Sequence, residues 1–256
     1  MTLSIIFSVF IVGAALGSFL NVCIHRLPQK KSLVFPGSSC PECNTSIKPY
    51  HNIPVLSYLL LRGRCAYCGA RISLRYPIIE LLTPLIALFL FWRFGLSAEL
   101  VYYTYFYLFL IVISFIDLDT YLILNKVLIA FFVGGVILNF WLNVVPWKTA
   151  LLGAVSGGGV LFLFALFGQW YFKKESMGMG DVKFATVLGF FLGWKLVLLS
   201  LYTGYLFAFI YIIILKIKKK QPTTEYIPMG PFFSLASIVW LSWWKELLDL
   251  YLTLII

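Results

Sequence analysis

The sequence predicts an all-α protein that crosses a membrane about eight times and carries one small cysteine-bearing insert between its first two spans. Of the 256 residues, 61% are hydrophobic and 12% are charged, whereas soluble domains average about 45–50% and about 25%. Apolar stretches of near-spanning length recur along most of the chain. These numbers exclude an ordinary water-soluble enzyme and a disordered chain.

The apolar stretches, taken in order, predict eight helices. The first is expected to be a retained span and not a signal peptide, because its basic residues follow the apolar run. The sixth is too short to cross a core of about 30 Å alone, so it begins below the interface or continues toward Trp194. The predicted spans are Leu3–Val22, Pro77–Phe94, Val101–Ile116, Ile123–Leu142, Trp147–Phe172, Val182–Leu192, Leu196–Leu215 and Gly230–Leu250.

This order of spans divides the chain into three parts. Residues 1–22 form the first transmembrane helix, residues 23–76 form a polar insert, and residues 77–256 form a membrane bundle. With eight spans, four of the 20 Lys and Arg residues fall on one side of the membrane and the other 16 on the opposite side. Loops rich in Lys and Arg stay in the cytoplasm. We therefore expect a cytoplasmic insert and both termini outside.

The net charge of +10 does not indicate nucleic-acid binding in this setting. The densest basic run, over residues 216–220, is too short and too close to the bilayer for a nucleic-acid interface. It is expected to contact anionic membrane lipid.

Four cysteines of the insert form two C-x-x-C pairs, Cys40 with Cys43 and Cys65 with Cys68. Two such turns can direct four thiolates at one Zn²⁺ ion, and a site filled by protein ligands is structural. Two disulfides or free thiols are the alternatives, and disulfides are disfavoured in a reducing cytoplasm. An insert of about 50 residues has too small a hydrophobic core to fold without a bound metal or a similar cross-link.

Aspartates lie at the ends of two predicted spans. Asp117 and Asp119 end the third span, and Asp181 follows Gly178 and Gly180 at the start of the sixth. These carboxylates could simply cap helix ends. The alternative is that Asp117 and Asp181 share a proton as an aspartyl protease dyad, one acting as general base and the other as general acid. The two glycines would then let substrate approach Asp181 closely.

Several segments together resemble the bacterial type IV prepilin peptidases, which are membrane aspartyl proteases of the GxGD class. The resemblance covers nearly the whole chain, with the segments in family order. They are residues 17–22, 25–28, the two cysteine pairs, 52–54, 62–65, 72–73, 75–80, 116–119, 178–183 and 227–232.

The resemblance implies an eight-span enzyme of the bacterial cytoplasmic (inner) membrane with its active site facing the cytoplasm. Such enzymes cut a basic leader peptide from prepilins and pseudopilins after a glycine. Asp117 and Asp181 match the two catalytic aspartates, and the surrounding motif adds Asp119 and Lys183 to the two glycines. The family often has Pro-Asp where this chain has Leu124-Asn125, and Asn cannot titrate, which favours Asp117 as the catalyst.

The resemblance also implies a second activity, which methylates the new N-terminal amine of the pilin with S-adenosylmethionine. No Gly-rich signature of a soluble methyltransferase is present in the sequence. The family pattern places the cofactor site near the first loop, where Glu80, Asn21 and Arg26 are candidates. A helix cap for Glu80 and a polar helix end for Asn21 are the structural alternatives.

Two other classes of function are compatible with parts of the sequence. A transporter would also carry intramembrane acids, but it predicts them near mid-membrane depth, whereas these acids lie at span ends. A non-catalytic zinc-bearing membrane scaffold would use the aspartates only as caps. A presenilin-like intramembrane protease shares the GxGD class, but it is not expected to carry the cysteine insert.

Overall fold

The structure, a computed structural model, describes residues 3–173, 177–218 and 227–255. Three basic residues of the predicted cytoplasmic loops, Lys174, Lys219 and Lys220, lie outside the described residues. The regular secondary structure of the described part is helical apart from two isolated antiparallel bridges, and residues 27–48 are mostly turns and irregular backbone. Its elements are α1 (Leu3–Arg26), the 3₁₀ helix η1 (Pro49–His51), α2 (Leu56–Leu60), α3 (Arg75–Phe94), α4 (Ala98–Thr120), α5 (Asn125–Leu142), α6 (Trp147–Phe172), α7 (Met179–Ile217) and α8 (Gly230–Ile255).

Among the described residues, six helices are long and apolar enough to cross a membrane. They are α1, α3, α4, α5, α6 and α7. The prediction of an all-helical membrane protein is therefore confirmed. The chain divides into two compact units, residues 1–108 and residues 109–256.

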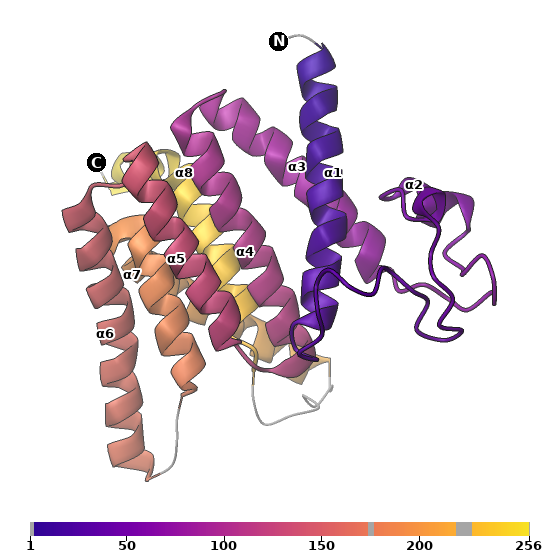
Figure 1. The fold of residues 1–256 in the computed structure, drawn as a ribbon. Helices are drawn as coiled ribbons and strands as arrows, with labels where there is room; N and C mark the ends of the chain where they lie inside the picture. The colour runs from indigo at the N-terminus through magenta and orange to yellow at the C-terminus, as the bar shows by residue number, and fades with distance from the viewer. Residues whose placement is uncertain (1–2, 174–176, 219–226, 256) are drawn as a thin grey trace. The chain divides into compact units, whose positions relative to one another are not determined.

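In the first unit, α1 and α3 lie side by side (Figure 1). Gly13 and Gly17 are four residues apart in α1 and allow the two backbones to approach closely. A Cβ atom on Gly13 would lie 2.6 Å from Cα of Pro84, and one on Gly17 would lie 3.0 Å from Cα of Glu80. This contact fixes Glu80, one of the candidate site residues, against α1.

In the second unit, α5, α6 and α8 pack against α7 (Figure 1). Phe131 of α5 stacks on Phe191 of α7 with ring centroids 4.6 Å apart. Gly153 of α6 faces Gly189 of α7, and a Cβ on either glycine would collide with the backbone of the other. Small residues at these positions thus bring α6 and α7 into backbone contact.

The helix α7 covers both the sixth and the seventh predicted spans, and it is broken at Gly193. This glycine has φ 75° and ψ 170°, a backbone conformation open to glycine and strained for other residues. A Cβ at Gly193 would lie 2.6 Å from Cγ2 of Thr149 in α6. The sixth predicted span therefore does run on toward Trp194, but a sharp break separates it from the seventh.

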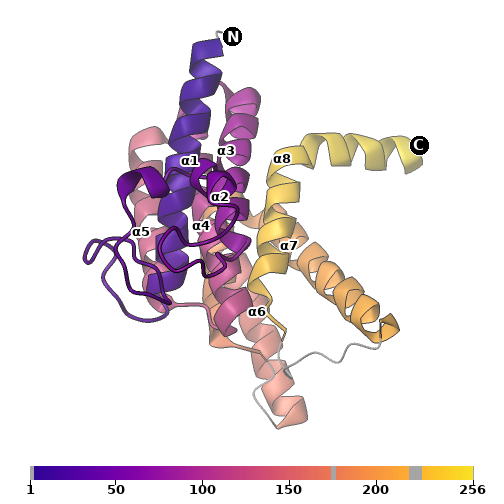
Figure 2. The same ribbon diagram turned by 90° about the vertical axis from the view of Figure 1, so that its right-hand side faces the viewer.

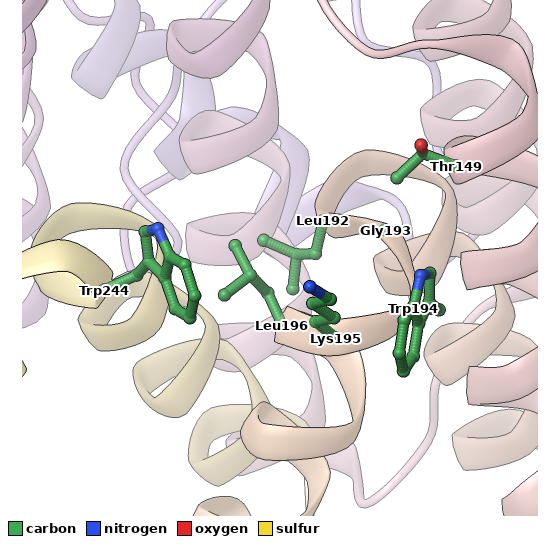
Figure 3. Close-up of a pocket in the computed structure, with 7 residues that line it drawn as sticks. All are labelled: Thr149, Leu192, Gly193, Trp194, Lys195, Leu196 and Trp244. Carbon is green, nitrogen blue, oxygen red and sulfur yellow. The ribbon is translucent and has the colours of Figure 1, made fainter. Parts of the chain in front are cut away.

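A pocket of about 370 Å³ lies around this break, lined by Thr149, Trp194, Lys195 and Trp244 among others. Figure 3 shows these lining residues. The Nζ atom of Lys195 lies 5.5 Å from the ring centroid of Trp194. Close by, α8 leaves helical geometry at Trp243 (φ −128°, ψ 20°), and Figure 2 shows the resulting bend. Tryptophan and lysine are typical of the membrane–water interface.

Candidate active site and metal centre

Asp117 lies in the last turn of α4 and is 3% exposed. The backbone N–H of Gly230, the first residue of α8, donates a hydrogen bond of 2.8 Å to its Oδ2 atom. The first N–H groups of a helix have no partner inside the helix and favour an anionic acceptor. A Cβ at Gly230 would lie 2.8 Å from Oδ2 and 3.2 Å from Cβ of Asp117, so the approach requires glycine.

Asp181 lies in the first turn of α7, three residues after its N-cap, Gly178. Its backbone N–H donates to the carbonyl oxygen of Gly178 at 3.0 Å, and its carboxylate turns back toward that glycine. Asp181 is half-buried and lies within electrostatic range of both Asp117 and Tyr205. The structure therefore brings the two predicted aspartates together, although they are 64 positions apart along the chain.

Two carboxylates held in this way have a definite chemical capacity. Like charges at close range disfavour double ionisation, so a pair of this kind can hold one proton between its two carboxyl groups. One carboxylate then accepts a proton from water, and the other group donates one to a carbonyl oxygen. The pair lies at helix ends, next to Gly178 and Gly180, which have no side chains to keep an extended peptide away.

The supporting residues occupy different positions around this pair. Asp119 is exposed at the end of α4. Lys183 is exposed in α7, and its Nζ donates to Oδ1 of Asn125 at 3.1 Å. A Cβ on Gly180 would lie 3.1 Å from Cβ of Ile123. The position at which the chain departs from the family's Pro-Asp pattern therefore holds the start of α5 against the start of α7.

Two residues near the aspartates had no role in the prediction from sequence. Gly230 belongs to the segment over 227–232, which carried part of the resemblance but suggested no contact. Tyr205 contacts Sδ of Met177 through its hydroxyl at 4.0 Å and packs its ring against Phe233. No sequence pattern pointed to Tyr205. Its position near Asp181 depends on the break in α7 at Gly193, which is a feature of the folded chain.

The four predicted metal ligands converge. The sulfur atoms of Cys40, Cys43, Cys65 and Cys68 all lie within 4.8 Å of one another, and those of Cys40 and Cys68 are 3.8 Å apart. A tetrahedral Zn²⁺ site with Zn–S bonds of about 2.3 Å places its sulfur atoms about 3.8 Å apart. All four are free thiols, not disulfides. The donor set therefore fits zinc in geometry and in chemistry.

Matching backbone hydrogen bonds build the two halves of this cluster. The N–H of Cys40 donates to Thr45 and that of Cys65 to Ala70, at 3.0 and 2.8 Å. The residue four positions after each first cysteine closes the turn with positive φ: Asn44 at 55° in the first knuckle and Gly69 at 73° in the second. Gly69 was predictable from its residue type, whereas Asn44 is the less obvious equivalent.

The local hydrogen bonds prepare some of these thiols to ionise. The side-chain and backbone groups of Thr45 lower the pKa of Cys43 to about 6. Backbone N–H groups of Cys68 and Tyr67 lower the pKa of Cys65. The N–H of Ala70 acts in the same direction on Cys68, but desolvation and the neighbouring thiols outweigh it and raise the pKa of Cys68 to about 12. A bound cation would let all four be thiolates together.

The methyl-transfer candidates Asn21 and Glu80 lie at the contact between α1 and α3. Asn21 donates from Nδ2 to the carbonyl oxygen of Tyr76 at 3.1 Å, and its buried Oδ1 has no hydrogen-bond partner in the described residues. Oε2 of Glu80 accepts a hydrogen bond of 2.7 Å from the N–H of Val55. Val55 has φ 61°, an unfavourable conformation for a β-branched residue, so this bond stabilises a strained turn.

Arg26 has a different environment from the other two candidates. Its Nη1 and Nη2 atoms donate to the carbonyl oxygens of Ser32 and Gly37, both at 2.9 Å. The guanidinium group thus holds the first turn of the insert against the end of α1.

The chain matches two family models and a group of curated proteins. Residues 11–94 match the bacterial peptidase A24 N-terminal domain, and residues 104–213 match the type IV leader peptidase family. The relatives named prepilin leader peptidase/N-methyltransferase include one from Aeromonas salmonicida, 34% identical over 97% of this chain and 94% of its own length. One from Pseudomonas aeruginosa is 33% identical over 98% and 94%, and one from Aeromonas hydrophila is 35% identical over 96% and 93%. No solved structure matches the chain significantly.

Proposed function

This chain belongs to the type IV leader peptidase family, and we propose that it cleaves the basic leader peptide from prepilins and pseudopilins with Asp117 and Asp181 as its catalytic pair. The observation that carries this proposal is the buried carboxylate of Asp117, held by Gly230 within electrostatic range of Asp181. Gly178, Gly180, Asp119 and Lys183 support the pair.

The hydrogen-bond pattern suggests how the two aspartates divide their roles. The N–H of Gly230 can only donate, so Oδ2 of Asp117 must act as an acceptor. The shared proton then lies on the other oxygen of Asp117 or on Asp181. In this mechanism the ionised group takes a proton from the attacking water, and the protonated group polarises the scissile carbonyl.

We propose eight membrane crossings, with both termini outside and the insert and aspartates on the cytoplasmic side of the inner membrane. The broken helix α7 then supplies two of them, and α8 supplies the last. The break at Gly193 supports this topology because Trp194 and Lys195 beside it are typical of an interface. The 16-to-4 division of basic residues supports the orientation.

We further propose that the chain methylates the new N-terminal amine of the pilin using S-adenosylmethionine. The names of the relatives support this second activity. Glu80 and Asn21 are the candidates for cofactor contacts, since one is a carboxylate and the other has an unpartnered buried oxygen. Arg26 contributes by shaping the adjoining backbone. A bound S-adenosylmethionine would supply the methyl group.

In this proposal the three parts of the chain have different functions. Residues 1–22 form the first span, and residues 23–76 form an insert with the methyl-transfer region, folded around one structural Zn²⁺ held by Cys40, Cys43, Cys65 and Cys68. Residues 77–256 form the bundle with the protease site. Zinc would supply folding free energy and no chemistry, because protein thiolates fill all four positions.

Mass spectrometry of a prepilin incubated with the purified protein and S-adenosylmethionine tests both activities together. We expect loss of the leader after a glycine and the gain of one methyl group on the new N-terminus. An intact prepilin would favour the rival readings, a transporter or a non-catalytic zinc-bearing scaffold. A cleaved but unmethylated product would support the protease alone.

A further inference from the structure

Three arginines of the second zinc knuckle surround one pocket. Arg62, Arg64 and Arg71 line a cavity of about 380 Å³, together with Tyr58 and Leu74 among others. The guanidinium group is always charged and presents a planar fork of donors that matches carboxylate and phosphate oxygens. Three such groups at one pocket form a receptor for an oxyanion.

The arrangement of the arginines is not required for folding the knuckle. Arg64 and Arg71 face each other across an isolated antiparallel bridge, and the equivalent bridge of the first knuckle pairs Ser39 with Ser46. The same backbone geometry is therefore built with small neutral side chains in one half of the cluster. Like charges placed directly opposite each other across a bridge are destabilising, and a bound anion would offset that repulsion.

The acidic residues of this unit are engaged or placed elsewhere. Residues 1–108 contain three of them, Glu42, Glu80 and Glu99. Glu80 accepts hydrogen bonds from Val55 and Ser18, and Glu99 lies in the first turn of α4. Glu42 lies inside the first knuckle, between Cys40 and Cys43. The anion that suits the pocket must therefore come from outside the unit.

The position of the pocket along the chain indicates where the bound anion would come from. Helix α3 begins at Arg75 and has 20 residues, which at 1.5 Å per residue gives about 30 Å, the thickness of the hydrocarbon core. If α3 spans the core, its first residue lies at a membrane surface. Leu74, which lines the pocket, is the residue immediately before α3, so such a span would place the pocket at the depth of the lipid phosphates.

Exposed apolar side chains flank the pocket on the same segment. Leu59 and Leu60 of α2 are 65% and 73% exposed, and Leu74 is 66% exposed. A surface that combines exposed leucines with clustered arginines is suited to the headgroup region, where apolar groups reach the acyl boundary and basic groups meet phosphate.

We propose that Arg62, Arg64 and Arg71 form a binding site for the phosphate group of an anionic phospholipid, which docks the cysteine insert on the membrane surface. The second knuckle fixes Arg64 and Arg71 across their bridge, and Gly63 lets the hydroxyl of Tyr58 approach the same backbone turn. A phospholipid headgroup and free phosphate would both offer phosphate oxygens to the arginines. The flanking leucines favour the lipid, because they can contact its acyl chains.

The test uses the zinc-loaded, full-length protein in a neutral detergent, with bound lipid counted by native mass spectrometry. Phosphatidylglycerol, phosphatidylcholine and inorganic phosphate are titrated separately. The variant R64S/R71S installs the residue type that the first knuckle carries at the equivalent positions, and K30S/K31S removes the same charge from exposed positions of the insert. Zinc content is measured for each variant.

We expect the parent protein to bind phosphatidylglycerol more tightly than phosphatidylcholine and to keep it in the presence of inorganic phosphate. Loss of two arginines near an anionic surface should weaken phosphatidylglycerol binding roughly 30-fold in R64S/R71S. K30S/K31S should bind as the parent does. If R64S/R71S loses zinc, the test uses R62S instead, because Arg62 lies outside the bridge. We expect R62S to weaken phosphatidylglycerol binding roughly fivefold.

Three outcomes would overturn the proposal. Unchanged lipid affinity in zinc-loaded R64S/R71S, or in R62S where that variant decides, would remove the arginines from lipid binding. An equal loss in K30S/K31S would reduce the effect to general charge. Displacement of phosphatidylglycerol by inorganic phosphate at similar concentration would make the pocket a site for free phosphate.

Discussion

The backbone N–H of Gly230 at the start of α8 donates to Oδ2 of Asp117 at the end of α4, over 2.8 Å. These two residues are 113 positions apart, and their contact leaves no room for a side chain at Gly230. One backbone group thus fixes the orientation of a buried carboxylate that the proposed mechanism depends on. This relationship makes Gly230 a positioning residue for Asp117.

Gly230→Ala should therefore lower leader cleavage by about 10- to 100-fold, because the added Cβ displaces the carboxylate from its hydrogen bond. Single-turnover cleavage of a prepilin by the purified variant measures the effect. Gly159→Ala is the matched control, since a Cβ at that position meets nothing within 4 Å. If both variants cleave at the parent rate, Gly230 does not position Asp117.

Removal of two zinc ligands should separate the two activities. The double variant Cys40→Ser/Cys43→Ser is expected to lose the metal, of which the parent should carry about one ion per chain. Metal binding and folding are coupled in a small domain, so the insert should unfold while the helices remain. We expect methyl transfer to be lost wholly and cleavage only partly, as measured by metal analysis and by mass spectrometry of the product. Full methylation by the metal-free variant would contradict a role of the insert in methyl transfer.

Glu80→Gln tests the charge of Glu80 separately from its hydrogen bond. The amide oxygen can still accept from the N–H of Val55, so the strained turn should persist and cleavage should stay within about twofold of the parent. The lost carboxylate should raise the KM for S-adenosylmethionine, whose sulfonium is cationic, with little change in kcat. Glu80→Ala should impair both parameters because the turn at Val55 is released. Equal KM values for Glu80→Gln and the parent would leave Glu80 a purely structural role.

Lys183→Gln should have a small effect. Lys183 is exposed and its hydrogen bond to Asn125 is solvent-accessible, and such a contact contributes about 1 kcal/mol or less to stability. We expect cleavage to fall by less than about tenfold, measured under the same single-turnover conditions. A loss as large as that of an aspartate variant would mean that Lys183 contacts the substrate directly.

The helical membrane fold was predictable because apolar runs of spanning length leave few alternatives. Their boundaries were less so: α1 continues to Arg26, four residues past the predicted end, because polar residues near the interface can continue a helix. The sequence did not predict whether the chain forms a loop or a sharp kink at Gly193. A glycine between two apolar runs is compatible with a loop or with a kink, and the close approach of Thr149 that selects the kink is a tertiary contact.

The candidate site was predictable where the residue types themselves indicate metal binding or acid–base chemistry. Two C-x-x-C pairs and two interfacial aspartates stand out in a chain with only ten acidic residues. Gly230 and Tyr205 do not stand out, because their importance comes from neighbours that are distant in sequence. The positive φ of Val55 likewise depends on Glu80, which only the folded unit brings to it.

The most direct test of the central claim measures leader cleavage by three purified single variants, Asp117→Asn, Asp181→Asn and Asp119→Asn. A dyad needs one carboxylate and one carboxylic acid, so the first two variants should lose at least about 100-fold in rate while inserting normally. Asp119 is exposed at the end of the same helix as Asp117 and has only a supporting role, so Asp119→Asn should have a milder effect than the other two variants. Near-parental cleavage by Asp117→Asn or by Asp181→Asn would contradict the account.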